Sequence, residues 1–129
     1  MRLAATIATL LVAQPLLADT ALRRYLWENR PILVFAERGD PRLAQQLALF
    51  EVETRDLADR KNVVIVETEP TSRLWQRYQP DGFTVILIGL DGAEKFRSAE
   101  VTDPDMLSTL IDTMPMRRQE LMRRGEIAG

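Results

Sequence analysis

The segment "PILVFA", Pro31 to Ala36, decides the fold that we predict for this chain. It is a short, continuous apolar run rich in residues that favour strands. Such a run is typical of a strand that is buried on both faces of a sheet. We therefore predict an α/β fold in which this segment is a central strand.

Helices are predicted on either side of this strand. Thr20 to Asn29 has the spacing of a short amphipathic helix that ends before Pro31. After the strand, Asp40 is placed to cap a helix whose first residue is Pro41. The apolar spacing that follows predicts a long helix to about Arg60, with one face formed by Leu43, Leu47, Phe50 and Leu57.

Further apolar runs predict the other strands. "NVVIVE", Asn62 to Glu67, is predicted as a second strand buried on both faces, and "FTVILIG", Phe83 to Gly89, as the third. Asp91-Gly92 is a hairpin signal, so Glu94 to Ser98 is predicted as an edge strand. Between the second and third strands, residues 70–72 open a short helix whose inward residues are Leu74, Trp75 and Tyr78.

The last predicted helix begins at Asp103-Pro104. Its inward-facing residues are predicted to be Leu107, Leu110, Ile111 and Met114. The order is then strand, helix, strand, helix, hairpin, helix. The first crossover is expected to be right-handed and parallel, and the hairpin must add antiparallel to it. This predicts a mixed four-stranded sheet with helices on both faces, an order that resembles the thioredoxin fold.

The catalytic marks of thioredoxins are missing from this chain. Thioredoxins carry their redox pair between the first strand and the long helix, where this chain reads Glu37-Arg38-Gly39-Asp40-Pro41. They also place a cis proline just before the third strand, where this chain has Gly82-Phe83-Thr84.

Composition excludes several classes of chemistry. The 129 residues contain no cysteine and no histidine, which excludes thiol redox catalysis, tetrahedral zinc sites and a Ser-His-Asp relay. Lysine and arginine total 17 against 19 acidic residues, and no basic stripe indicates a nucleic-acid partner. We expect neither a cofactor nor a metal site, and the length fits one domain.

The N-terminal residues predict a secretory signal. Met1-Arg2 is a short positive start, Leu3 to Val12 is apolar, and Leu16-Leu17-Ala18 offers a cleavage site of small residues. We expect residues 1–18 to be removed and residues 19–129 to form one domain, periplasmic or secreted. The apolar run is shorter than a membrane span requires, which favours a removed signal over the alternative of an uncleaved anchor, and no stable span is expected after removal.

Sequence blocks give a closer resemblance. "LRRYLWENRPILVFA", "FTVILIGLDGAEKFRS" and "LIDTMPMRRQE" are similar to signature blocks of domain-of-unknown-function family 4174. The resemblance implies a thioredoxin-like or peroxiredoxin-like exported bacterial protein, related to domains of animal sushi-repeat extracellular proteins, with no assigned activity. Leu90 departs from the family, which has lysine in this turn, so a lysine contact to a ligand would be lost.

The stretch "IDTMPMRRQE", Ile111 to Glu120, has two interpretations. In the structural one, Pro115 ends or kinks the helix near Met114, Asp112 or Thr113 caps a restarted helix, and Glu120 pairs with Arg124. In the functional one, Met114, Pro115 and Met116 form a soft apolar surface for a protein partner, and Arg117 presents its guanidinium to a partner carboxylate or to Asp112.

Other candidate sites are weaker. Trp27 and Arg30 either anchor a partner or form a buried closure of the sheet edge. Arg38 and Gly39 at the start of the long helix are a candidate anion site, although Asp40 as a cap would compete for the same donors. The carboxylate pairs Glu67/Glu69 and Asp103/Asp105 are interpreted as solvated and capping groups rather than as catalytic or metal sites.

The leading hypothesis is a non-catalytic binding or accessory module whose partner is a cell-envelope or extracellular protein. One alternative is an enzyme that uses carboxylate or arginine chemistry at the first strand-to-helix junction, with Glu37 and Arg38. Another is a peroxiredoxin-like accessory subunit that borrows a partner's thiol. The oligomeric state is left open.

Overall fold

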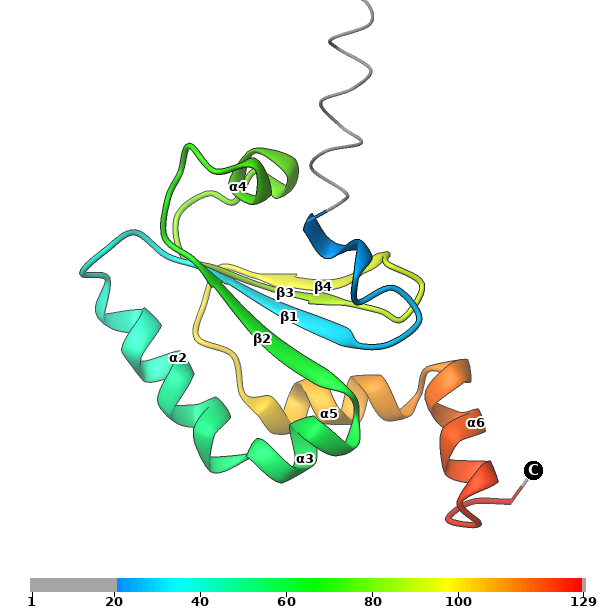
Figure 1. The fold of residues 1–129 in the computed structure, drawn as a ribbon. Coiled ribbons are helices and arrows are strands. Elements are labelled where there is room, and N and C mark those ends of the chain that lie inside the picture. Colours follow the sequence, from blue (N-terminus) through cyan, green and yellow to red (C-terminus); the bar gives the residue numbers. More distant parts are fainter. Residues whose placement is uncertain (1–20, 129) are drawn as a thin grey trace, which may run out of the picture.

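A computed structural model describes residues 21–128 of the chain (Figure 1). A four-stranded mixed sheet with strand order β2-β1-β3-β4 forms its centre. β1 pairs parallel with β2 and antiparallel with β3, and β3 pairs antiparallel with β4. The elements are β1 (Arg30–Phe35), α2 (Pro41–Val52), α3 (Thr54–Asp59), β2 (Asn62–Glu67), α4 (Arg73–Tyr78), β3 (Thr84–Ile88), β4 (Glu94–Ser98), α5 (Pro104–Asp112) and α6 (Pro115–Arg123).

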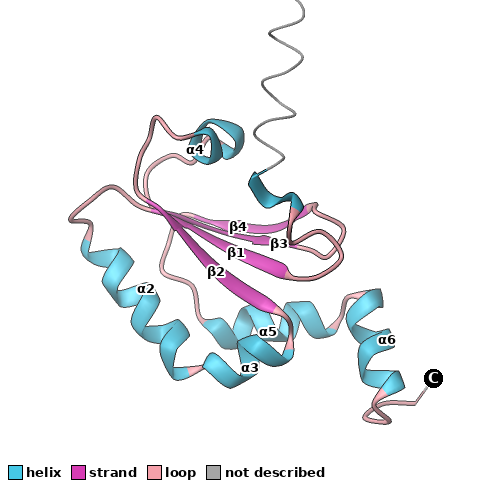
Figure 2. Cartoon of the chain, in the orientation of Figure 1, coloured by secondary structure: helices cyan, strands magenta, loops and turns pink. Residues whose placement is uncertain are grey.

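Helices cover both faces of the sheet, as Figure 2 shows. On one face, α2, α3 and α5 pack on a core that includes Ile32, Val34 and Leu87. On the other, α4 brings Leu74 and Trp75 against Leu33, Phe35 and Ile86. β1 is fully buried, because it lies between two strands and two layers of helices. The predicted α/β class and mixed four-stranded sheet are confirmed, and the arrangement is consistent with a thioredoxin-like fold.

The second strand is present, but the prediction that both its faces are buried was wrong. β2 has the predicted bounds but lies at the edge of the sheet, so its two faces are only partly covered. Val64 and Val66 are 37% and 40% exposed. The apolar run had suggested a central strand, but the order of strands is set by distant pairing and not by composition.

The predicted long helix is broken near Glu53. α2 ends at Val52 and α3 begins at Thr54, with Glu53 between them at φ −104°. The β-branched Thr54 follows this residue, and its hydroxyl donates to the Glu51 carbonyl at 2.7 Å. That local hydrogen bond competes with the helical pattern and turns the chain.

The other helix starts agree with the sequence. Asp40 caps α2 by accepting from the Arg42 N–H, and Asp103 caps α5 by accepting from the Asp105 N–H. Ser72 caps α4 in the same way through Trp75 N–H. The prediction of a short helix over residues 20–29 was too long: within the described chain, helix covers residues 21–23 and turns follow to residue 28.

The break at Pro115 is present, but its caps differ from the prediction. α5 ends at Asp112, and Pro115 is the first residue of α6. Met114 stands at the N-cap position without a capping side chain, so neither Asp112 nor Thr113 caps the restart. Asp112 instead accepts hydrogen bonds from arginine side chains.

The predicted signal, residues 1–18, lies outside the described residues. Within residues 21–128, none of the helices has the length and apolar character needed to cross a membrane.

Candidate functional site

Arg117 is the centre of an ion-pair network between α6, α5 and α3. Its side chain is 2% exposed, although it is an arginine on the surface helix α6. Its guanidinium donates to Asp112 Oδ1 at 2.9 Å and to Asp59 Oδ2 at 2.8 Å. It also donates to the Asp59 carbonyl at 3.1 Å and to Glu120 Oε1 at 3.3 Å. Acceptors of this chain therefore occupy the hydrogen-bond donors of the Arg117 guanidinium.

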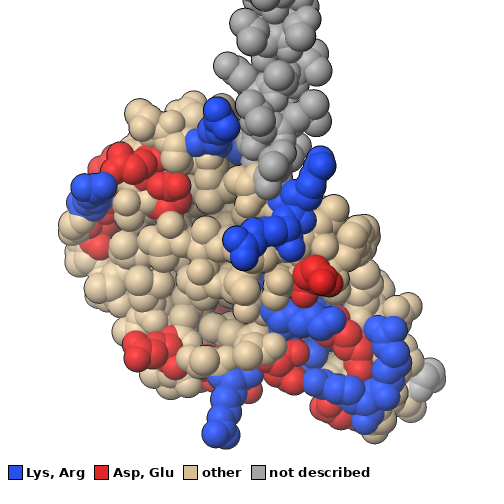
Figure 3. All heavy atoms as spheres, viewed as in Figure 1, with Lys and Arg blue, Asp and Glu red and all other residues tan. Residues whose placement is uncertain are grey.

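Arg30 extends the network to the start of β1. It is 1% exposed and reaches Glu120 Oε2 at 3.0 Å and the Arg60 carbonyl at 3.0 Å. Arg60 in turn donates to both oxygens of Asp112. The predicted pair Glu120–Arg124 was wrong, because Glu120 binds Arg30 and Arg117, whereas Arg124 binds Asp59 at 2.6 Å. Figure 3 shows basic and acidic side chains interleaved around α6.

The electrostatics of the network favour charged carboxylates. Hydrogen bonds from Arg124 and then Arg117 hold the pKa of Asp59 well below its usual range. Burial acts to raise the pKa values of Asp112 and Glu120. Hydrogen bonds from their arginines outweigh burial, and both pKa values are lowered. The network is thus a set of fixed ion pairs rather than a source of an exchangeable proton near neutral pH.

A hollow lies beside this network and unites several predicted binding residues. We call it the methionine hollow: it has a volume of about 240 Å³ and is lined by Arg30, Gly89, Leu90, Asp91, Lys95, Met114, Pro115 and Met116. Asp91 and Lys95 pair across its rim at 3.0 Å. Residues far apart in the sequence, Arg30 and Met114 to Met116, meet here because the start of β1 adjoins the α5–α6 break.

Trp27 lies next to the methionine hollow but does not close the sheet edge. Its side chain is 58% exposed, so the expectation of a buried tryptophan was wrong. Its backbone is left-handed at φ +64°, and its N–H donates to the Leu90 carbonyl at 2.8 Å. Non-glycine residues rarely adopt this conformation, and a surrounding structure must hold them in it. Trp27 therefore combines an exposed aromatic side chain with a strained backbone conformation.

The resemblance singled out Leu90 only because it implies a lysine in this turn. In the structure it is 6% exposed, lines the methionine hollow and binds Trp27 through its carbonyl. The leucine gives the hollow an apolar wall beside Met114 and Met116. The roles of Asp59 and Arg60 in the network were missed altogether, since only the packing of the end of α3 against α5 and α6 brings them to it.

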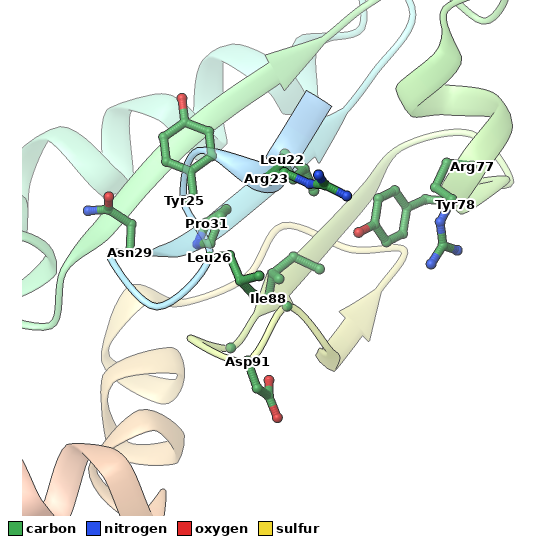
Figure 4. A pocket seen from close by; sticks show the side chains of 12 residues that line it. Leu22, Arg23, Tyr25, Leu26, Asn29, Pro31, Arg77, Tyr78, Ile88 and Asp91 are labelled. Carbon is green, nitrogen blue, oxygen red and sulfur yellow. The ribbon is translucent and has the colours of Figure 1, made fainter. Parts of the chain in front are cut away.

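A second hollow lies between the N-terminal segment, α4 and the turn after β3 (Figure 4). We call it the tyrosine hollow: it has a volume of about 270 Å³, and its lining includes Tyr25, Tyr78, Arg23, Arg77 and Asn29. Arg23 from the N-terminal segment and Tyr78 from α4 extend toward each other in Figure 4. Asp91 lines both hollows, so the turn after β3 separates them.

The junction between β1 and α2 is occupied by its own side chains. Asp40 accepts from the backbone and the guanidinium of Arg42 at 2.9 and 2.7 Å, which fills the helix start. Arg38 pairs with Glu69 at 2.7 Å on the surface. These pairs compete with an anion at Arg38 and Gly39, and with the alternative of arginine or carboxylate catalysis there.

Acidic side chains gather where α3 meets the start of α5. Oxygens of Glu53, Asp56 and Asp105 lie within 4.8 Å of one another, a grouping that no motif in the sequence indicated. A hydrogen bond with Asp56, and then the charge of Asp105, raise the pKa of Glu53. Oxygen ligands suit hard cations, but these groups are largely exposed and no further feature points to an ion.

The comparisons with known proteins give one assignment. No curated protein matches the chain at a significant level. The family model "Domain of unknown function (DUF4174)" matches residues 21–120, a range that contains the methionine hollow, Trp27 and Arg117. That range covers most of the 129 residues. The chain therefore belongs to the DUF4174 family of domains of unknown function.

Proposed function

We propose that this protein is a non-catalytic protein-binding module whose binding surface consists of Trp27 and the methionine hollow. The observation that carries the proposal is Trp27, held 58% exposed in a left-handed conformation and tied by its N–H to Leu90 in the wall of the hollow. Backbone strain of this kind is concentrated at functional sites. Exposed tryptophans are frequent anchors of protein interfaces.

The chemistry of the surface indicates the kind of partner. Met114 and Met116 offer flexible, polarizable side chains, and Leu90 adds an apolar wall. The charges beside them are already paired: Arg30 with Glu120, and Lys95 with Asp91. We therefore propose that the partner inserts an apolar side chain into the hollow and packs against the Trp27 indole.

Arg117 has a positioning role in this proposal rather than a contact role. It fixes α6 on α3 and α5, and so sets the position of Met114 to Met116 at the start of α6. The sequence-based hypothesis that Arg117 binds a partner's carboxylate draws no support from its 2% exposure.

We further propose that the module acts in the periplasm or outside the cell. The support is the pattern of residues 1–18, with a basic start, an apolar run and small residues before Asp19. The absence of cysteine and histidine supports a role without thiol or imidazole catalysis.

Partner capture by variants tests the binding surface. Wild-type protein, Trp27→Ala and the matched control Val52→Ala, which changes an 81% exposed apolar residue elsewhere, are used to capture proteins from the envelope fraction. We expect one set of proteins with wild type and Val52→Ala, reduced at least tenfold with Trp27→Ala. Equal capture by all three would contradict the proposal.

Fluorescence gives an independent readout of the same surface. The chain has two tryptophans, and Trp75 is 8% exposed in the core, so Trp75→Phe leaves Trp27 as the only indole. Its emission should be that of an exposed indole and should shift to shorter wavelength when a captured partner is added. No shift on binding would place the contact elsewhere on the chain.

A further inference from the structure

The two edges of the sheet differ in how they are protected. β4, at one edge, carries the exposed charged residues Glu94, Lys95 and Arg97. β2, at the other, has four consecutive apolar residues, and Val64 and Val66 are 37% and 40% exposed. Charged side chains on an edge strand prevent pairing with another chain, and an apolar edge permits it. The β2 edge is therefore the one available for strand addition.

The backbone of β2 presents its outer groups in a definite pattern. The carbonyls of Lys61 and Glu67 accept hydrogen bonds from β1, from the N–H groups of Arg30 and Ala36. The backbone N–H and C=O groups of successive residues point to opposite sides of a strand. Those of Val63 and Ile65 therefore also face β1. The N–H and C=O groups of Asn62, Val64 and Val66 then point away from the sheet.

We propose that β2 pairs antiparallel with β2 of a second copy of this chain, with Val64 on the two-fold axis. In this register Val64 faces Val64, and Asn62 faces Val66 of the partner copy. The backbone groups of all these residues point outward, so their N–H and C=O groups can exchange hydrogen bonds as an antiparallel ladder requires. Dimers with two-fold symmetry are the commonest assemblies of identical chains.

Charge complementarity favours a second copy over an unrelated strand. The same register places Lys61, the turn residue just before β2 at φ +60°, near Glu67 of the partner copy, once at each end of the pairing. Lys61 is half exposed and lies 3.8 Å from Glu120, and the Glu67 carboxylate accepts the Glu69 N–H on the surface. Neither contact removes the charge from the edge, and opposite charges that approach each other at both ends of the pairing attract.

Shape agrees with this register. A hollow with a volume of about 320 Å³ lies beside β2, and its mainly apolar lining includes Leu47, Phe50, Leu57 and Val64. Residues directly opposite each other in an antiparallel pair project to the same face. Val64 and Val66 of the second copy would therefore project beside this hollow and cover its apolar wall. Figure 3 shows this side of the molecule largely without charged side chains over β2.

The pairing goes beyond the proposed function and does not depend on it. Trp27 and the methionine hollow lie where β1 begins and β3 ends, whereas the pairing uses the outer edge of β2. A dimer would present two copies of the Trp27 surface, and two linked sites raise the apparent affinity for a repeated or clustered partner.

The mass in solution gives the first test. Light scattering on the purified full-length chain is expected to give twice the 14.7 kDa of one chain. Val64→Lys puts like charges on the two-fold axis, and we expect at least a tenfold weaker association with an unchanged circular dichroism spectrum. A wild-type monomer at about 100 μM, or a Val64→Lys dimer as stable as wild type, would overturn the proposal.

A charge exchange tests the register itself. Lys61→Glu and Glu67→Lys should each weaken the dimer, because each sets like charges opposite one another. The double variant should recover most of the lost association, since it restores an opposite-charge pair at each end with the two signs exchanged. Failure of the double variant to recover any association would overturn this register.

Cross-linking gives a readout that does not depend on the strength of the dimer. The chain has no cysteine, so Val64→Cys introduces a single thiol whose Cα should lie about 5.5 Å from its copy. We expect rapid disulfide formation under mild oxidation. Ala99→Cys, an exposed position after β4, is the matched control and should form no cross-link. Equal cross-linking of both variants, or none at Val64→Cys, would overturn the proposal, and neither outcome would affect the test of Trp27.

Discussion

Arg117 Nε lies 2.9 Å from Asp112 Oδ1, across the break between α6 and α5. The pair holds the two helices at the angle that Pro115 creates. Because Arg117 also binds Asp59 on α3, one guanidinium connects three helices. The geometry of the methionine hollow therefore depends on a buried side chain that does not line it.

Removing Arg117 should destabilise the protein substantially. We expect Arg117→Ala to lower the free energy of unfolding by about 3 kcal/mol, because Asp59, Asp112 and Glu120 lose their shared cation. The partial exposure of Asp59 and Asp112 keeps the effect at the lower end of that for a buried pair. Urea unfolding measures the change. The neighbouring Arg118 is exposed, and Arg118→Ala should stay within about 0.5 kcal/mol of wild type.

The same network should make stability depend on acid. The folded pKa values of Asp59, Asp112 and Glu120 all lie below the ordinary values of 3.8 for aspartate and 4.5 for glutamate. Below about pH 5 the unfolded state then binds more protons than the folded state, so acid favours unfolding. We expect the urea midpoint to be flat from about pH 8 to 6 and to fall from about pH 5 downward.

A variant isolates the contribution of the network to this pH dependence. Asp59→Asn has no carboxylate to titrate, so the fall in the urea midpoint between about pH 5 and 3 should be shallower than in wild type. Arg118→Ala serves as the control and should keep the wild-type slope. A slope in Asp59→Asn as steep as that of wild type would assign the acid sensitivity to other carboxylates.

Local patterns in the sequence were sufficient for most of the fold. The apolar runs around Leu33 and Ile86 predicted strands, and Asp40 and Asp103 predicted helix starts, because capping and burial are decided by near neighbours. The burial of β2 was not predictable in this way. Its apolar run looks like that of β1, and only the pairing of β1 with β3 leaves β2 at the edge.

The candidate site was predicted in part. Arg30 and the Met114 to Met116 segment do meet at one hollow, and Asp112 was among the expected partners of Arg117. Asp59 could not be identified, because 58 residues separate it from Arg117. One interpretation placed Trp27 as a buried closure of the sheet edge, but its side chain is 58% exposed and its backbone is left-handed at φ +64°, which no sequence pattern indicated.

The backbone at Trp27 gives a prediction that separates binding from folding. Trp27→Gly removes the indole at a residue with φ +64°, a conformation that glycine adopts without strain. We expect it to raise the free energy of unfolding by up to about 1 kcal/mol while partner capture is lost. Trp75→Ala is the contrasting change, since Trp75 is buried, and should cost about 3 kcal/mol or more. A destabilised Trp27→Gly would mean that the indole serves packing.

Gln46 offers a test of how α2 is fixed to the loop before α5. It is fully buried, its amide donates to the Thr102 carbonyl at 2.8 Å, and its carbonyl accepts the Thr102 N–H at 2.6 Å. Gln46→Leu keeps the volume but leaves both backbone groups of Thr102 buried and unpaired, so we expect a loss of about 2–3 kcal/mol. The adjacent Gln45 is exposed, and Gln45→Leu should change the urea midpoint little. A loss with Gln46→Leu as small as that with Gln45→Leu would show that α2 does not depend on this contact.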